Sequence, residues 1–578
     1  MDRDSKEKKF GSSDHVEDKD AFQRSDSYSP NHELSGQTRP RRTTEEKQAM
    51  LKVAQAADPG LLWSSKRSMQ FWGMVLVICC CGGDTGLDAT TMSSINGMKQ
   101  YQNYFGMNAA ATKTFFGIYT IGGVCASLPG SYLPDKIGRR WTMVIGNTVL
   151  LLGALLSANA RNMSMFTAGR FLTGLGCTTA ALASKSYMAE ISSPHNRGRC
   201  MGLLNSFYYI GQILASGIAV PMGRRGDDYS WRVPLFIQLG PPLINIGFMA
   251  LLPESPRWIY SRGDTEKARQ ILANLHSRDR DINSPLIAFE IEEIEESISL
   301  DGADKRWWDF RKLVNSAANR YRLGLCFMVS VYGQLSGNGL ITYFLTILLA
   351  QAGIKSQDRI LTLNFVNSVT SFIGALTGTA IVDRVGRRKL MLFACICCTI
   401  GMAIVAGLLS PSGPQTTQRA EAGVTFIYLF MVFFSLGWTP LQGLYPTEVL
   451  AYEVRAKGLA VQSLATQAVS CINTFGMPVA LSVLKWKTYI IFAVFDFVGI
   501  FVIYFFAVET KVRLWGVRDA APLHDRLTNN FHLAQQQIPL EQMDEIFQAS
   551  SPRAYSLQLA AQARLKAKQA QADKESRA

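Results

Sequence analysis

The stretch L-P-D-K-I-G-R-R, from Leu133 to Arg140, decides the fold, because it returns as I-V-D-R-V-G-R-R from Ile381 to Arg388. Each copy follows a run of about twenty apolar residues, the length of a membrane span. The two copies lie 248 positions apart, measured from Asp135 to Asp383. One charged motif placed after two separate apolar runs indicates a membrane protein that is built twice on one plan.

The apolar residues explain how the chain meets the membrane. It has 578 residues, of which 48% are hydrophobic, and the apolar ones gather in blocks of about twenty, enough to cross about 30 Å of hydrocarbon. Backbone groups inside a bilayer must bond to one another, so each block should be a helix. The predicted fold class is an all-α membrane protein with twelve transmembrane helices. The twelve blocks lie near Met69–Cys81, Lys113–Tyr132, Met143–Ala160, Met165–Met188, Leu203–Met222, Pro234–Leu252, Leu323–Leu349, Ile360–Val382, Leu390–Leu409, Val424–Tyr445, Leu459–Val483 and Tyr489–Val508.

Cysteine and histidine usage excludes several kinds of site. All eleven cysteines lie in or against the apolar blocks, where they serve as small packing residues rather than as disulfide or zinc ligands. All six histidines lie outside the blocks. We therefore expect no metal and no cofactor.

The net charge of +14 is explained by orientation. Loops after even-numbered blocks are basic, so the positive-inside rule predicts that both termini are cytoplasmic. Since the charge is spread over loops and tails, it needs no nucleic acid partner. The first 65 residues are polar and Ser-rich without an apolar signal-peptide core, so we expect a disordered cytoplasmic tail.

Two further motifs repeat at nearly the same spacing as the first. Glu190 and Arg197 correspond to Glu448 and Arg455 at an offset of 258, and Glu254 corresponds to Glu509 at 255. These offsets indicate two parallel six-helix repeats. The predicted organisation is an N-terminal tail (1–65), a six-helix half (66–253), a cytoplasmic linker with surface helices (254–322), a second six-helix half (323–511) and a cytoplasmic C-terminal tail (512–578).

Several motifs resemble those of a known family. G-R-F-L-T-G-L-G from Gly169 to Gly176, P-E-S-P-R-W from Pro253 to Trp258, the paired D-x-x-G-R-R and a late E-T-K resemble the sugar porter family of the major facilitator superfamily. The resemblance covers about Trp72 to Lys511, and within the family it is nearest to fungal lactose, cellodextrin and hexose permeases. It implies secondary transport of a sugar.

The repeated charges predict a cytoplasmic gate. Carboxylates and guanidinium groups at helix ends can pair bidentately across neighbouring helices and hold the two halves together. Such pairs are worth about 0–1 kcal/mol each at a wet membrane edge, so the gate could still open. The alternative is that they are ordinary positive-inside anchors. The predicted gate residues are Asp135, Arg139, Arg140, Glu190, Arg197, Glu254, Asp383, Arg387, Arg388, Glu448, Arg455 and Glu509.

Charged residues inside spans cost about 2.5–3.5 kcal/mol each and so suggest function. The resemblance implies that Asp84 of the first span pairs with Arg170 of the fourth, as in proton-coupled members of the family. A nearby arginine favours a charged carboxylate and loss of water favours the neutral acid, so movement of the pocket could couple transport to protons. The alternative is a static ion pair that orients two helices. Asp496 is also inside a span, without an assigned role.

A sugar pocket needs amides for hydrogen bonding and aromatic rings for stacking. The resemblance implies Asn205, Gln334, Asn338 and Asn473 as the polar contacts and Tyr343, Phe344 and Trp438 as the aromatic ones. The alternative for each amide is a helix-to-helix hydrogen bond. Gly333, Gly339 and Gly443 stand where the family has larger side chains, which favours an enlarged pocket and a substrate such as a disaccharide.

The carboxyl-terminal tail departs from the family pattern. The family ending P-L-E-x-M-D follows E-T-K almost at once, but here it starts only at Pro539. We hypothesise that residues 512–537 are encoded by a retained intron, and the alternative is a cytoplasmic insertion.

Together these features predict a secondary active transporter that takes up a mono- or disaccharide across the plasma membrane by alternating access, coupled to protons. We expect a monomer whose partners are the sugar, the proton and membrane lipid. The sequence has no G-x-x-x-x-G-K-[ST] loop, which disfavours an ATP-driven pump. The alternatives are a non-transporting sugar sensor and a porter for a polyol or an acid such as quinate. An enzyme is not expected, since the spans contain no cluster of catalytic residues.

Overall fold

A computed structural model describes residues 65–510 with short gaps at 107–108, 194–196, 250, 303–309, 352–353, 355, 411–416, 452–453 and 485, and also residues 50, 53–54, 58, 546–547, 552, 554–556 and 558. All regular structure in these residues is helical. The predicted all-α class is therefore confirmed. The segment 512–537, for which the sequence suggests an intron, lies outside the described residues.

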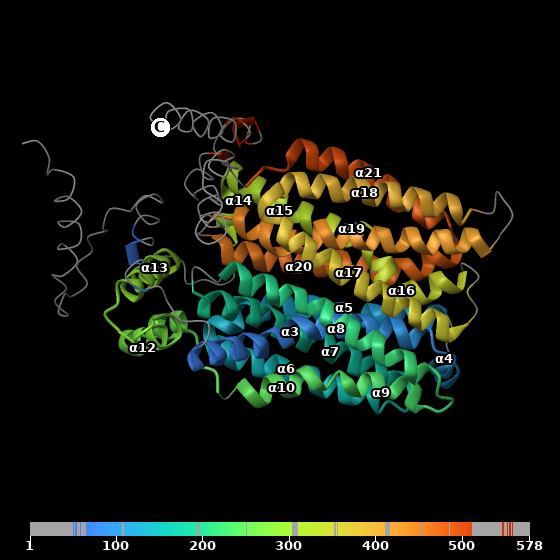
Figure 1. Cartoon of the computed structure of the whole chain (residues 1–578), viewed down its shortest axis with the longest axis horizontal. Helices are drawn as coiled ribbons and strands as arrows, with labels where there is room; N and C mark the ends of the chain where they lie inside the picture. Colours follow the sequence, from blue (N-terminus) through green and yellow to red (C-terminus); the bar gives the residue numbers. More distant parts are fainter. Residues whose placement is uncertain are drawn as a thin grey trace, which may run out of the picture.

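The helices form two halves that lie side by side, with a group of short helices beyond one end (Figure 1). The amino-terminal half contains α3 (Lys66–Asn96), α4 (Lys99–Phe105), α5 (Ala109–Ile137), α6 (Arg139–Ala158), α7 (Met163–Ile191), α8 (Arg197–Gly223), α9 (Tyr229–Ile237) and α10 (Gly240–Met249). The linker contains α11 (Pro256–Ser261), α12 (Thr265–His276) and α13 (Pro285–Gly302). The carboxyl-terminal half contains α14 (Arg311–Asn315), α15 (Ala317–Leu335), α16 (Asn338–Gln351), α17 (Gln357–Val385), α18 (Arg387–Leu408), α19 (Thr417–Val449), α20 (Arg455–Val483) and α21 (Lys487–Phe506).

Eight of the described helices are long and apolar enough to cross a membrane: α3, α6, α8 and α17 to α21. The other four predicted spans correspond to α5, to α7 and to the pairs α9–α10 and α15–α16. The first predicted span, Met69–Cys81, is too short, because α3 continues to Asn96 through a stretch that is polar yet almost entirely buried. The second part of α3 can lie inside the bundle because neighbouring helices bury it, although its composition is not apolar.

Two predicted spans are broken rather than continuous. The sixth span divides at Gln238 and Leu239, just before Pro241 and Pro242, which cannot donate backbone hydrogen bonds. The seventh divides at Ser336 and Gly337, where Gly337 has a φ of +96° that side chains other than glycine rarely adopt. The apolar pattern could not reveal either break, since both sides of each remain apolar.

Helices of the amino-terminal half pack backbone to backbone at small residues. A Cβ atom added at Gly86 of α3 would lie 1.8 Å from the Tyr208 carbonyl oxygen of α8, and one at Gly211 of α8 would lie 2.1 Å from the Gly83 carbonyl oxygen. Such close approach is typical of membrane helix pairs, where packing replaces the hydrophobic effect. It fixes α3 and α8 side by side.

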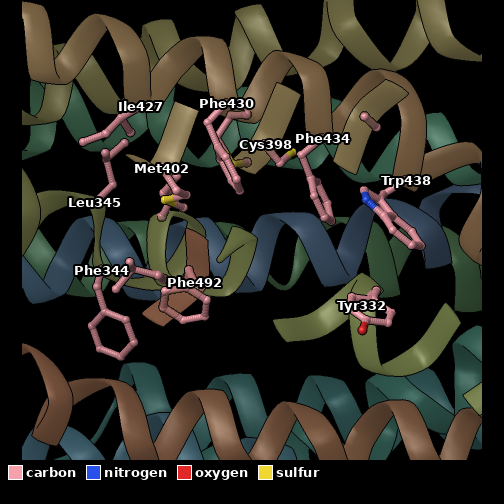
Figure 2. Close-up of a cluster of buried hydrophobic side chains, with 14 of the residues drawn as sticks. Tyr332, Phe344, Leu345, Cys398, Met402, Ile427, Phe430, Phe434, Trp438 and Phe492 are labelled. Carbon is pink, nitrogen blue, oxygen red and sulfur yellow. The ribbon is translucent and has the colours of Figure 1, made fainter. Parts of the chain in front are cut away.

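A buried hydrophobic cluster runs through the carboxyl-terminal half. Figure 2 shows Phe430, Phe434 and Trp438 of α19 above Phe492 and Tyr332, with Met402 between them. The Trp438 and Tyr332 rings stack with their centroids 6.3 Å apart. This packing holds the break of the seventh span against α18, α19 and α21.

The linker helices lie beyond one end of the bundle, which we call the linker end; the opposite end is the far end (Figure 1). His276 of α12 contacts the Ile191 carbonyl oxygen at the end of α7 (3.0 Å) and Glu290 of α13 (2.6 Å). Arg67 of α3 donates to the Ser277 carbonyl oxygen at 3.3 Å. These contacts fasten the linker to the amino-terminal half.

Residues near the end of the chain also pack at the linker end. Ile546 and Phe547 are buried, and the Phe547 ring lies 5.7 Å from the Tyr321 ring and 4.7 Å from the Arg322 guanidinium. Phe547 thus packs against the start of α15.

Candidate substrate and proton site

The buried arginine of the fourth span pairs with a different acid from the predicted one. Arg170 of α7 donates to both carboxylate oxygens of Asp88, at 2.6 and 2.9 Å, and its guanidinium lies 4.9 Å from the Tyr119 ring. Gln238, at the break between α9 and α10, donates to Asp88 at 3.2 Å. The predicted pair of Asp84 with Arg170 is therefore wrong. Asp88 lies one turn beyond Asp84, and that spacing could have pointed to it as a rival partner.

Asp84 is buried without a counter-charge. Asp84 is 4% exposed, and no described group forms a hydrogen bond to either of its carboxylate oxygens. An ionised carboxylate in such surroundings would be costly, so the neutral acid is favoured. The span thus holds two acids in different surroundings: Asp88 is paired with Arg170, whereas Asp84 has no such partner.

The structure describes two contacts of the predicted amides. Asn205 of α8 faces Gly443 of α19, since a Cβ at Gly443 would lie 3.5 Å from the Asn205 amide nitrogen. Asn473 of α20 donates to the Gln334 carbonyl oxygen. The Oδ1 atoms of Asn338 and Asn473 are buried and accept no hydrogen bond from the described residues. Unsatisfied buried amides are expected where a polar ligand binds.

Two further amides were not among the predicted contacts. Gln212 of α8 and Asn367 of α17 are buried, and each keeps a side-chain oxygen that no described donor reaches. Gln212 lies two turns after Asn205 on the same helix, so helical spacing was the available signal.

The predicted aromatic residues differ in position. Tyr343 of α16 lies close enough to Asp88 and Arg170 for their charges to act on its hydroxyl group. Phe344 and Trp438 are fully buried in the hydrophobic cluster (Figure 2), although the Trp438 indole nitrogen lacks an acceptor among the described residues. Packing accounts for Phe344, and the sugar contacts of all three remain predictions.

Gly333, Gly339 and Gly443 were predicted to enlarge the pocket, but Gly333 and Gly339 do not enlarge it in this structure. A Cβ at Gly333 would lie 3.1 Å from the Gln442 side-chain nitrogen, and one at Gly339 would lie 2.8 Å from the Asn473 nitrogen. The space that larger side chains would fill is taken by neighbouring amides. Only the Gly443 position, with 3.5 Å to Asn205, retains ordinary clearance among the three.

The repeated charged motif builds a helix cap in the amino-terminal half. Gly138 has a φ of +106° and precedes α6, and Glu254 accepts hydrogen bonds from the backbone nitrogens of Arg139 (3.0 Å) and Arg140 (3.1 Å). Arg139 also pairs with Glu190 of α7 at 2.9 Å and with Asp135 at 2.8 Å. A carboxylate at a helix amino terminus is favoured by the free backbone donors there.

The carboxyl-terminal half repeats this cap. Gly386 has a φ of +98°, Glu509 accepts from the Arg387 backbone nitrogen at 2.9 Å, and Arg387 pairs with Glu448 at 2.8 Å. Arg388 donates to the Tyr504 carbonyl oxygen at 2.8 Å. The side chains of Arg197 and Asp383 lie outside the described ones. None of these contacts joins the two halves, so for the pairs described here the prediction that they hold the halves together is wrong. A gate role of the remaining predicted residues stays a prediction.

We expect Glu254→Gln to destabilise the amino-terminal half by about 1–2 kcal/mol, because the amide keeps an acceptor but loses the charge that stabilises the start of α6. Thermal unfolding of the purified protein would measure this. Glu295→Gln, at an exposed position of α13, is the matched control. Equal unfolding temperatures for the two variants would contradict the capping role.

Other hydrogen bonds do join the halves, at mid-span and at the far end. Tyr209 of α8 contacts Ser435 (3.0 Å) and Thr439 (2.7 Å) of α19 near the middle. At the far end, Gln357 donates to the Gly223 carbonyl oxygen (2.8 Å) and Arg224 pairs with Asp358 (2.6 Å). The described hydrogen bonds therefore hold the halves together at mid-span and at the end opposite the linker.

Comparison with known proteins places this arrangement among membrane carriers. The family model described as "Sugar (and other) transporter" matches residues 74–515. The chain is 27% identical to the MFS-type transporter criB of Aspergillus cristatus (76% of this chain, 92% of the relative) and 26% identical to a high-affinity glucose transporter of Kluyveromyces lactis (75% and 82%).

Solved structures share the fold. The proton:xylose symporter XylE, in complex with 6-bromo-6-deoxy-D-glucose, has a TM-score of 0.63 at 19% identity, covering 77% of this chain and 97% of that chain. A partially occluded inward open conformation of XylE from E. coli also has a TM-score of 0.63, at 20% identity, covering 76% and 98%. The arrangement of the helices is thus that of a major facilitator transporter.

Proposed function

Because the chain belongs to the sugar (and other) transporter family, we propose that it is a proton-coupled carrier that takes up a mono- or disaccharide across the plasma membrane. The family is one of transporters and not of enzymes, and the chain is a multi-pass membrane protein. A glucose transporter and a proton:xylose symporter are among the similar proteins, and their printed activities support the proposal.

The observation that carries the proposal is a set of buried amides on α8, α16, α17 and α20, each of which contacts a helix of the other half. Asn338, Asn473, Gln212 and Asn367 each keep an oxygen without a donor from the described residues. A sugar hydroxyl can supply that donor, and several hydroxyls on one ring can reach amides from both halves at once. Binding at this boundary is what a carrier that works by rocking its halves requires.

The proton site lies beside this boundary. Asp84, without a counter-charge, is the residue we propose to carry the proton, while Arg170 is held by Asp88. When the halves part, water can reach Asp84 and allow it to ionise. In the proposed orientation the linker end is cytoplasmic, as the basic loops indicate. The hydrogen bonds and the ion pair that join the two halves at the far end would then close the carrier on its extracellular side.

Uptake measurements test the function. Cells without their own sugar carriers, expressing this chain, should accumulate at least one of labelled glucose, lactose or cellobiose, and a protonophore should abolish the accumulation. Uptake of quinate or a polyol in place of these sugars would favour the non-sugar porter. Binding without uptake of any of them would favour the sensor.

Gly443→Trp should reduce uptake of a disaccharide more than uptake of glucose, by roughly tenfold or more. An indole at this position would project toward Asn205 across the boundary of the halves, where the structure leaves ordinary clearance only. Competition assays with labelled glucose and unlabelled disaccharide would measure the change. Gly247→Trp, at an exposed position of α10 with open space around it, is the control. An equal loss for both sugars would contradict a size limit set by this position.

A further inference from the structure

Asp496 is a buried acid that the proposed mechanism does not use. It lies in the middle of α21, its exposed fraction is 0%, and neither carboxylate oxygen has a hydrogen-bond partner in the described part of the chain. Its backbone carbonyl oxygen accepts a hydrogen bond from the Cys395 thiol at 3.2 Å. A carboxyl group without a charged partner inside a membrane protein is an expensive feature that suggests a function.

The span interiors of the carboxyl-terminal half offer no cationic side chain to neutralise this acid. The interiors of its six spans (323–351, 360–382, 390–408, 422–447, 458–483 and 488–506) contain no Lys, Arg, His, Asp or Glu other than Asp496. The titratable groups that face Asp496 are Tyr332 of α15 and Cys395 and Cys398 of α18, and none of them can carry a positive charge. Since no side chain inside these spans can neutralise the carboxylate, binding of a proton is the simplest way to neutralise it.

Asp496 also lies next to the break between α15 and α16, which divides the seventh span. Ser336, at that break, faces Asp496, and its hydroxyl donates to the Tyr332 carbonyl oxygen at 2.6 Å. One turn along α21 in each direction, the helix touches the break region. A Cβ at Gly337 would lie 2.5 Å from Met402 and 3.5 Å from Phe492, and a Cβ at Gly499 would lie 2.5 Å from Tyr332.

We propose that Asp496 is a second proton-binding carboxyl group, located in the carboxyl-terminal half, and that its proton occupancy depends on how the break between α15 and α16 packs against α21. In the packed arrangement the acid is dry and holds its proton. If α16 swings away at Gly337, water reaches the carboxyl group, which then releases the proton. No other bond changes, and the proton passes to water.

A structural role alone does not explain this residue. A leucine would fill the same space among Tyr332, Cys395 and Phe495 without bringing a carboxyl group out of water. The position between the break and α18 is therefore better explained by a proton site than by packing.

Infrared spectroscopy of the purified protein in lipid tests the proposal directly. Protonated carboxyl groups give a C=O stretch that ionised carboxylates lack, and exposed acids are ionised at neutral pH. We expect Asp496→Asn to remove one component of this band. We expect Gly337→Ala, which strains the break, to lower the pH at which the Asp496 component disappears by roughly one pH unit or more. Gly407→Ala, a position of α18 with open space around it, should leave that pH unchanged.

Two results would overturn the proposal: an unchanged band in Asp496→Asn, or an unchanged titration in Gly337→Ala. If Asp496→Asn fails to fold, the infrared band is recorded in Asp84→Asn instead. A band that survives this substitution must come from another buried acid. Loss of the whole band would contradict a proton on Asp496. If Gly337→Ala fails to fold, Met402→Ala loosens the same contact. The link to transport rests on the proposed function, whereas the infrared result does not require sugar uptake, so the two can fail separately.

Discussion

Replacing Asp84 with Asn should abolish accumulation of sugar against its gradient while sparing exchange of labelled for unlabelled sugar. The amide resembles the neutral acid in shape and hydrogen bonding but cannot release a proton. Because Asp84 is buried without a counter-charge, the variant should fold as the wild type does. Exchange needs only movement of the loaded carrier, so it should persist.

Concentrative uptake and counterflow in vesicles with an imposed pH gradient would measure the two activities. Asp227→Asn, an exposed acid in the loop before α9, is the control and should accumulate sugar normally. If Asp84→Asn still accumulated sugar to the wild-type level, Asp84 would not be the coupling residue. Asp88 would then be the next acid to examine.

Arg170→Met should have the largest effect on stability, about 3–5 kcal/mol, because it leaves the Asp88 carboxylate buried without its partner. In the wild type, the guanidinium forms two hydrogen bonds to that carboxylate and is itself 2% exposed. Met has a similar length and an apolar end, so the loss of stability would come from the missing charge rather than from a change in side-chain volume. We expect the unfolding temperature and the yield of folded protein to fall together.

The double variant Arg170→Met with Asp88→Asn separates the two causes. Removing both charges eliminates the unpaired carboxylate, so most of the lost stability should return. Thermal unfolding in the same detergent would compare the single and double variants. If the double variant were as unstable as Arg170→Met, packing around Arg170 and Tyr119 would be the source of the effect.

Much of the fold follows from the apolar blocks and the repeated motif. Blocks of about twenty apolar residues specify helices because a bilayer permits little else, and the recurrence of D-x-x-G-R-R specifies two similar halves. The polar second part of α3, from Gly83 to Asn96, escaped this reasoning. Hydropathy treats each helix as if lipid surrounded it, whereas this part is surrounded by other helices.

The side-chain pairings were harder to predict than the helices. A motif fixes which residues sit at a helix end, but the partner depends on rotamers and on the neighbouring helix. Thus Glu254 and Glu509 cap helices of their own halves, and Arg170 selects Asp88 over Asp84, which is one turn nearer the start of α3. The break at Gly337 depends on a backbone conformation with positive φ. A glycine permits this conformation but does not require it, so the sequence alone did not predict the break.

Cysteine labelling tests the central claim, that a polar cavity between the halves opens to each side of the membrane in turn. In a background without the native cysteines, Asn338→Cys and Asn367→Cys should react with water-soluble reagents, and glucose or lactose should protect both. Val494→Cys, on the outward surface of α21, should react with lipid-soluble reagents only. If Asn338→Cys and Asn367→Cys instead behaved like Val494→Cys, or were closed to water from both sides, the carrier mechanism would be contradicted.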